Sequence, residues 1–248
     1  MKNVADEATQ RLFSEAGISR GMKVLEVGCA VGRLTSVIAE VVGSEGSVVG
    51  VDKNEKSLEI AREQLNNTKH VSFVQGDLER LSMDGEFDAI VGRRVFMYLA
   101  DPGGAIKNLV PLLKPNGVFA IQEHSCLLPM VGGSLMPIHQ KYAHMAWETV
   151  RREGGDIQIG PKLWSYLTEG GIQVEDTRAE YIIQTPSVPY PYAQIFPLMK
   201  GRILANNVAS EDELNLEGLE ERLKEERDTA QTMFVSDVAF CLWGRKQA

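Results

Sequence analysis

Small and acidic residues that could bind a nucleoside-containing ligand cluster in the first third of the chain. The first group follows the pattern E-x-G-x-A-x-G and comprises Glu26, Gly28, Ala30 and Gly32. Residues this small let the backbone approach a ligand, and glycine adopts the φ values that such a turn requires. Asp52 could accept hydrogen bonds from both ribose hydroxyls of a nucleoside. Asp77 could accept one from an adenine amino group, beside a backbone N–H and an apolar wall at Leu78.

The elements that must position these residues alternate between strands and helices. Short apolar runs predict strands at 22–27, 47–51, 71–74, 87–91 and 118–122, and helical spacing predicts helices at 4–16, 33–42, 55–66 and 103–113. Such alternation is typical of a doubly wound α/β fold with a mostly parallel sheet covered on both faces. The carboxyl ends of parallel strands meet at one edge, so the small and acidic residues should meet there.

Two other phosphate-binding patterns fit the glycine-rich segment less well. A dinucleotide fingerprint beginning at Gly28 would need glycines at positions 30 and 33, where this chain has Ala30 and Arg33. The segment also lacks the Lys-Ser/Thr ending of a phosphate-binding P-loop.

Five ordered segments resemble the motifs of class I S-adenosylmethionine-dependent methyltransferases of the small-molecule type. They are VLEVGCAVGR, GVD, QGDL, FDAIV and LKPNG, at residues 24–33, 50–52, 75–78, 87–91 and 113–117. The resemblance covers roughly residues 20–125 and the closing strand pair. It implies seven strands in the order 3-2-1-4-5-7-6, with the last strand antiparallel.

The resemblance also implies that S-adenosylmethionine is the cofactor and assigns its contacts. Glu26 would support the loop and the cofactor's amino group, and the loop residues Gly28, Cys29, Ala30 and Gly32 would line the methionine moiety. Asp52 would hold the ribose, Lys53 would flank the adenine, and Asp77 and Leu78 would read it. The backbone of Gly92 and Arg93 would meet the methionine end. Two departures from the family pattern stand out, Ala30 at the middle glycine and the arginine pair at 93–94. The arginines could be surface partners, or could bind the cofactor carboxylate or an acidic substrate.

The remaining segments predict a lid on a single domain spanning 1–248. We expect the lid to comprise an N-terminal helix at 1–19 and insertions at 126–158 and 186–232, because Pro- and Gly-rich stretches with aromatics make poor sheet. Within and between them the spacing predicts helices at 137–152, 162–167 and 211–230 and strands at 173–184 and 234–243.

A sulfonium methyl donor is already activated, so the protein must mainly align an acceptor and remove its proton. His124, just past the fifth strand, is the candidate base, with a structural histidine as the alternative. Glu123 is expected to be structural. Six lid or loop residues could contact the acceptor, with ordinary lid packing as the alternative: Tyr98, His139, Tyr142, His144, Tyr190 and Tyr192.

The predicted reaction is methyl transfer to an oxygen or carbon atom of a small molecule, such as an aromatic natural product. The alternatives are a tRNA or protein methyltransferase, which would need a basic rim, and a protein that keeps the cofactor but catalyses another reaction such as cyclisation. No catalytic metal is predicted, because Gly92 and Arg93 stand where a metal-binding carboxylate would follow the fourth strand.

The composition limits the kinds of partner that we expect. The 248 residues include 26 Lys and Arg against 34 Asp and Glu, a net charge of −8, which argues against a nucleic-acid partner. No apolar run reaches the roughly 18–20 residues of a membrane span, so we expect no membrane partner. The three cysteines form no disulfide or zinc pattern, which favours a cytoplasmic protein. A homodimer remains open.

Overall fold

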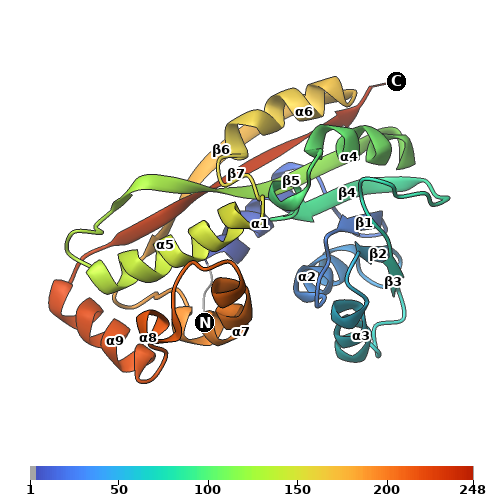
Figure 1. Cartoon of the computed structure of the whole chain (residues 1–248). Coiled ribbons are helices and arrows are strands. Elements are labelled where there is room, and N and C mark those ends of the chain that lie inside the picture. Colours follow the sequence, from blue (N-terminus) through green and yellow to red (C-terminus); the bar gives the residue numbers. More distant parts are fainter. Residues whose placement is uncertain (1–3, 248) are drawn as a thin grey trace.

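The computed structural model describes residues 4–247, and a single sheet organises them (Figure 1). Its strand order is β3-β2-β1-β4-β5-β7-β6, and β7 runs antiparallel to both neighbours. The strands are β1 (Lys23–Val27), β2 (Ser47–Asp52), β3 (Val71–Gln75), β4 (Phe87–Arg93), β5 (Leu113–Val131), β6 (Ile172–Gln184) and β7 (Phe234–Lys246). The predicted fold class and strand order are confirmed.

Helices cover the two faces of the sheet. One face carries α1 (Val4–Glu15) and α2 (Arg33–Val42), and the other carries α4 (Pro102–Leu109) and α6 (Leu163–Glu169). Helix α3 (Glu55–Gln64) packs on β2 and β3. Three 3₁₀ turns, η1 (Phe96–Tyr98), η2 (Val110–Leu112) and η3 (Gly160–Lys162), complete this part.

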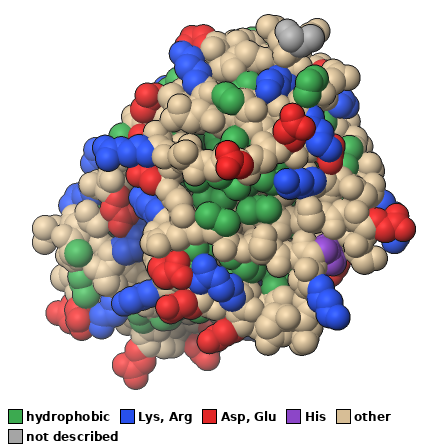
Figure 2. Space-filling model, turned by 90° about the vertical axis from the view of Figure 1, so that its right-hand side faces the viewer, with side chains coloured by type: hydrophobic (Ala, Val, Ile, Leu, Met, Phe, Trp, Pro, Cys, Tyr) green, Lys and Arg blue, Asp and Glu red, His purple; other side chains and the backbone are tan. Residues whose placement is uncertain are grey.

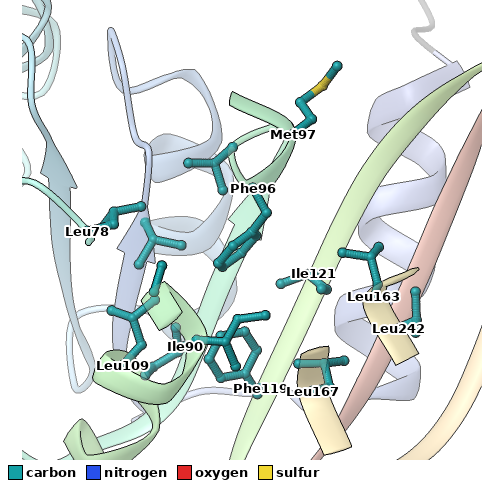
Figure 3. Close-up of a cluster of buried hydrophobic side chains, with 14 of the residues drawn as sticks. Leu78, Ile90, Phe96, Met97, Leu109, Phe119, Ile121, Leu163, Leu167 and Leu242 are labelled. Atoms are coloured by element: carbon teal, nitrogen blue, oxygen red, sulfur yellow. The ribbon is translucent and has the colours of Figure 1, made fainter. Parts of the chain in front are cut away.

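The period-2 alternation of the central strands supplies both core layers. In β5, Phe119 and Ile121 point to the α4 and α6 face, where Leu242 of β7 joins them (Figure 3). Val118 and Ala120, the alternate residues of β5, face the α1 and α2 layer. A strand buried on both faces must be apolar throughout, which explains the continuous hydrophobic runs of the sequence.

A second group of helices gathers beneath the extended ends of β5, β6 and β7 (Figure 1). These helices are α5 (Pro137–Arg152), α7 (Tyr192–Ala205), α8 (Glu211–Leu214) and α9 (Leu219–Ala230). They share a core of their own, in which Tyr142, Phe196 and Leu223 pack with Phe234 of β7. This helical group, residues 137–152 and 192–230, is called the lid below.

Several elements differ from their predicted lengths. The helix expected at 103–113 ends as α4 at Leu109 and is followed by η2, because Leu113 already belongs to β5. Strand β5, expected at 118–122, runs from Leu113 to Val131, because it pairs with β4 from Leu113 and with β7 as far as Val131. The helix expected at 211–230 is split into α8 and α9. Asn215 and Gly218 adopt left-handed backbone angles, with φ of 37° and 60°, which end one helix and begin the next.

The N-terminal segment covers the sheet. Residues 1–3 of the predicted lid helix at 1–19 lie outside the described residues. In the described part, Leu12, Phe13 and Ala16 pack against Trp243 and other sheet residues, so α1 belongs to the sheet's core layer. Among residues 4–247, no helix combines the length and hydropathy needed to cross a bilayer.

Candidate active site

The glycine-rich segment forms a tight turn between β1 and α2. The amides of Gly28 and Cys29 both donate to the carbonyl of Val51, at 2.8 and 3.0 Å, which anchors the turn across the end of β2. Gly28 has a φ of 69°, and a Cβ there would lie 2.4 Å from Cγ2 of Val95. Only glycine fits both the backbone angle and the space at this position.

Asp52, at the end of β2, is held by two backbone amides. Its Oδ2 accepts from Ala30 N and its Oδ1 from Asn54 N, each at 2.9 Å. Asn54 caps α3 by accepting from Ser57 N. These bonds fix the Asp52 carboxylate between the glycine-rich turn and the start of α3. Asp77, beyond β3, is more exposed and accepts from Glu79 N at 3.1 Å.

The strand ends surround a cavity of about 250 Å³, called the strand-end cavity here. Its lining includes these predicted cofactor residues: Gly28, Ala30, Asp52, Lys53, Asp77 and Leu78. Arg94, Val95, Tyr98 and Leu99, from the segment after β4, close the opposite side. The structure therefore brings together residues from four strand ends that are far apart in sequence.

Glu26 lies behind this cavity, in the middle of the sheet, between Gly50 of β2 and Val91 of β4. It is only 1% exposed, and burial raises the pKa of its carboxyl to about 7, against the lowering influence of the nearby Thr35 hydroxyl and of the Arg93 charge. Its Oε2 has no hydrogen-bond partner within the described structure. A buried acceptor without a partner is costly, so this oxygen suits a donor brought by a ligand.

Glu123 of β5 shapes the segment after β4. Its Oε1 accepts from the amides of Val95 and Phe96, at 2.7 and 2.8 Å, which caps η1. Complete burial nevertheless raises the pKa of Glu123 to about 7. This cap holds Arg94 in a left-handed conformation, with φ of 54°, between two cavities.

The second cavity, called the aromatic cavity, has a volume of about 280 Å³ and lies between the sheet edge and the lid. Arg94 and Tyr98 line it as well as the strand-end cavity, so the two cavities adjoin. Its other walls include Trp147 of α5, Tyr190, Tyr192 and Phe196 at α7, Arg202, Ser236 and Asp237. The Arg94 guanidinium lies 5.9 Å from the centre of the Trp147 ring.

The predicted acceptor residues lie in three different places. Tyr98, Tyr190 and Tyr192 line the aromatic cavity. Tyr142 and His139 instead lie in the lid core: the Tyr142 hydroxyl donates to Leu214 O at 2.6 Å, and His139 Nδ1 donates to Glu226 Oε2 at 2.6 Å. Burial lowers the pKa of His139 despite this pair. His144 is exposed and lines a separate surface hollow with Gly133 and Gln140.

His124, the predicted base, is 2% exposed and lies beside the aromatic cavity without lining it. Its Nδ1 is 2.6 Å from Oδ2 of Asp237, and its Nε2 is 3.2 Å from Nε2 of Gln122. Burial lowers the pKa of His124, against the raising influence of Asp237.

Asp237 was absent from the sequence-based prediction. The only signal for it was a lone carboxylate inside the otherwise apolar final strand, FVSDVAFCLW. Asp237 is 7% exposed and reaches the aromatic cavity. Trp147 also lines this cavity, as does Arg94, for which the sequence left surface pairing and ligand binding open.

Besides Glu26, four predicted cofactor residues do not line the strand-end cavity: Cys29, Gly32, Gly92 and Arg93. Cys29 is buried in the glycine-rich turn, where burial raises the pKa of its thiol. Gly32 begins α2, and Gly92 is buried beside Val27 at the end of β4. Arg93 donates to Thr9 Oγ1 of α1 at 3.3 Å and, together with Gly32, borders a neighbouring hollow.

The surface near β3 and α3 mixes charges of both signs. Figure 2 shows this side with hydrophobic side chains in a central group and Lys, Arg, Asp and Glu scattered around it. No continuous basic area is visible on this face. Within residues 4–247 no cluster of three or more His, Cys, Asp or Glu side chains could hold a metal ion.

The sequence of this chain is similar to those of known methyltransferases. Residues 18–168 match the family model described as a methyltransferase domain. A demethylmenaquinone methyltransferase of Staphylococcus aureus is 35% identical over 121 residues, which cover 47% of this chain and 48% of the relative. The ubiquinone/menaquinone biosynthesis C-methyltransferase UbiE of Idiomarina loihiensis is 35% identical over 158 residues, 62% of this chain and 61% of the relative. The matched region thus spans less than two thirds of either relative.

The fold is also similar to a solved enzyme structure. Phosphoethanolamine N-methyltransferase 2 of Haemonchus contortus, in complex with phosphomonomethylethanolamine and S-adenosylhomocysteine, superposes with a TM-score of 0.62 at 16% identity. The superposition covers 98% of this chain and 53% of that one.

The strand order and the acidic residues at the strand ends define an α/β fold that binds a nucleoside cofactor. The chain belongs to the class I S-adenosylmethionine-dependent methyltransferases, within the methyltransferase domain family. Its residues fit that cofactor, because the unpartnered Glu26 Oε2 suits an ammonium group and the strand-end cavity offers Asp52 to a ribose.

Proposed function

We propose that the protein transfers a methyl group from S-adenosylmethionine to a hydroxyl oxygen, or to a carbon next to one, in an uncharged aromatic small molecule. One observation carries this proposal: the strand-end cavity and the aromatic cavity meet at Arg94 and Tyr98. A donor in the first and an acceptor in the second would be neighbours, and alignment is most of what methyl transfer requires of a protein.

In this proposal, each part of the cofactor is bound by particular residues of the chain. Asp52 holds the ribose, while Asp77 and Leu78 contact the adenine, with Lys53 alongside. Glu26 and the turn from Gly28 through Cys29 and Ala30 to Gly32 hold the amino-acid end, together with the backbone of Gly92 and Arg93. When bound, the cofactor supplies a methyl group activated by the positive charge of its sulfonium.

The charges around the aromatic cavity favour an uncharged acceptor. Arg202 forms a bidentate ion pair with Glu153, and the charge of Arg94 lies close to that of Asp237. Because each arginine lies close to a carboxylate, the cavity has no excess positive charge to bind a phosphate and no excess negative charge to bind an ammonium group. The rings of Trp147 and Tyr190 suit a flat apolar body.

Similarity to enzymes named as quinone-related methyltransferases supports a hydroxylated ring as the acceptor. A bicyclic quinol headgroup is therefore the first compound to try, and carbon methylation is the first outcome to look for. His124 enters this proposal through its contact with Asp237.

The first test is calorimetric titration with S-adenosylmethionine and, separately, with NADH. Micromolar binding of S-adenosylmethionine alone is expected. Turnover is then followed as S-adenosylhomocysteine release with 1,4-dihydroxynaphthalene, and the position of the new methyl group is read by NMR. Release without a methylated product would favour plain cofactor hydrolysis, and absence of cofactor binding would reject the proposal.

A further inference from the structure

Four hydrogen bonds connect α1 to the floor of the aromatic cavity. Arg93 Nη1 donates to Thr9 Oγ1 at 3.3 Å, and the Thr9 hydroxyl donates to Gln122 Oε1 at 2.6 Å. Gln122 Nε2 lies 3.2 Å from His124 Nε2, and His124 Nδ1 lies 2.6 Å from Asp237 Oδ2. Each link joins a donor to an acceptor in the same direction, from the guanidinium to the carboxylate.

This chain of bonds determines the state of His124. The ionised carboxylate of Asp237 only accepts, so His124 Nδ1 carries the proton. The amide nitrogen of Gln122 only donates, so His124 Nε2 is an acceptor that is already used. His124 is therefore neutral, with both ring nitrogens engaged, and its side chain is shielded from the cavity.

Asp237 is the member of the chain that reaches the cavity. Its Oδ2 accepts from His124 and its Oδ1 from Ser236 Oγ at 2.8 Å. A carboxylate offers about four acceptor positions, so each oxygen can accept a further hydrogen bond. An acceptor molecule in the aromatic cavity can therefore meet the carboxylate, whereas it cannot meet the imidazole.

We propose that Asp237 is the catalytic base that contacts the acceptor hydroxyl and takes its proton, and that His124 is a positioning residue acting only through Asp237. This inference rests on the proposed function and names the acceptor as a compound with a hydroxyl group on an aromatic ring. It moves the proton-accepting role from the sequence-predicted residue to a carboxylate on the neighbouring strand.

The step balances without a further reactant. The acceptor's oxygen, or the ring carbon beside it, forms a bond to the methyl carbon as the methyl–sulfur bond breaks, and that electron pair stays on sulfur. The hydroxyl proton passes to Asp237. For carbon methylation, the ring proton leaves afterwards to water, and Asp237 returns its proton to the oxygen, which restores the aromatic hydroxyl and the ionised carboxylate. An oxygen that is gaining a methyl group becomes strongly acidic, so a carboxylate of low basicity suffices when the transfers are concerted.

The surroundings of Asp237 keep it ionised. Burial raises its pKa, but the His124 N–H donor and the Arg94 charge outweigh burial and lower it. Titratable groups face it from three directions: His124 and Cys126 on β5, Arg94 after β4, and Tyr190 and Tyr192 at α7. Among these groups, His124 donates a hydrogen bond to Oδ2 of Asp237. His124 does not line the aromatic cavity, so a mutation can remove this donor without changing the cavity wall.

The first experiment measures the ionisation of a bound phenol without catalysis. The protein is saturated with S-adenosylhomocysteine and titrated with 4-nitrophenol, whose phenolate absorbs visible light. We expect the wild type to bind the neutral phenol and to raise its apparent pKa, because the hydroxyl donates to Asp237. In Asp237→Asn the unbalanced charge of Arg94 should lower that pKa. Equal values in both proteins would overturn the assignment.

The second experiment uses turnover of 1,4-dihydroxynaphthalene. Asp237→Asn should lower kcat by about 100-fold, the lower end of general-base effects, with unchanged affinity for S-adenosylmethionine. His124→Leu should lower kcat less and move the acid limb of kcat/KM to higher pH, because Asp237 loses the donor that holds its pKa down. A larger loss in His124→Leu than in Asp237→Asn would return the base role to His124.

The lid provides a matched control. His139 and Glu226 form another buried pair with a 2.6 Å contact, outside the lining of the aromatic cavity. Glu226→Gln should leave both the phenol pKa and the pH profile unchanged. The outcomes also separate the two proposals. A wild type that fails to bind S-adenosylmethionine contradicts the proposed function. One that binds it and fails to bind 4-nitrophenol contradicts the inference about the acceptor, as does an Asp237→Asn variant that keeps wild-type turnover.

Discussion

Gly28 and Val95, which both line the strand-end cavity, approach each other so closely that a methyl group on Gly28 would lie 2.4 Å from Cγ2 of Val95. The glycine-rich turn and the segment after β4 are thus fitted to each other. Glu123 fixes the Val95 side of this contact through the Val95 and Phe96 amides. This contact fixes how closely the glycine-rich turn approaches the segment after β4.

Gly28→Ala should therefore lower the affinity for S-adenosylmethionine at least tenfold. It should also lower the free energy of unfolding by about 1–3 kcal/mol, because its φ of 69° strains any other residue. Gly21→Ala is the control, since Gly21 has a φ of 82° with nothing within 4 Å of the added atom. It should cost about 1 kcal/mol and leave binding unchanged. Equal affinities in the two variants would contradict the prediction.

Asp52→Ala should weaken cofactor binding by about 10- to 100-fold, as expected from losing hydrogen bonds to a charged group. The fold should remain, because Asp52 lies at a strand end and its side chain accepts hydrogen bonds from two local backbone amides, those of Ala30 and Asn54. Calorimetry and thermal unfolding measure the two effects. Glu55→Ala, which breaks only an exposed pair with Arg62, is the control and should bind normally.

Glu26→Gln should change how stability depends on pH. Burial raises the pKa of Glu26 to about 7 in the folded protein, from an ordinary value of 4.5. The folded state thus favours the protonated carboxyl, and stability is lost as pH rises through this window. At pH 8 the cofactor-free variant should be more stable than the wild type, by on the order of 3 kcal/mol. The difference should vanish near pH 4.5, where the carboxyl is protonated in the folded protein. Urea unfolding at several pH values measures this difference in the free energy of unfolding, and Glu45→Gln, at an exposed position, is the control. A difference between Glu26→Gln and the wild type that does not depend on pH would contradict the prediction.

Glu226→Ala should loosen the lid while leaving the cofactor site intact. Glu226 accepts from the amides of Ile138 and His139 at the start of α5, and from the His139 ring. Losing this cap should cost about 1.5–3 kcal/mol and speed hydrogen exchange in α5. Cofactor affinity should not change. Glu225→Ala, at the exposed neighbouring position, should exchange as the wild type does.

The sequence predicted the centre of the sheet well because its central strands, such as β1 and β4, are buried on both faces. A run such as that around Val24 and Leu25 is apolar throughout, since alternate residues face two helix layers. That Asp52 and Asp77 lie at one edge of the sheet could also be predicted, because the carboxyl ends of parallel strands meet there whatever the side-chain packing. Asp52 and Asp77 needed no knowledge of long-range packing.

The acceptor side could not be predicted in the same way. Whether Tyr142 or Tyr192 faces the cavity depends on how α5 and α7 pack, and both lie at helical positions that suit either role. The pairing of His124 with Asp237 crosses 113 residues of sequence and depends on the register between β5 and β7. A local pattern contains no information about such a register.

The position of β7 between β5 and β6 has a consequence for how the protein is made. Strands β5 and β6 are both synthesised before the strand that joins them, so each exposes a long unpaired edge until β7 is inserted. Exposed edges are templates for pairing with other chains. Folding at the ribosome should therefore be most vulnerable to aggregation just before β7 emerges. The same late event brings Asp237 to His124, so the sheet closes and the wall of the aromatic cavity is completed in a single step of synthesis.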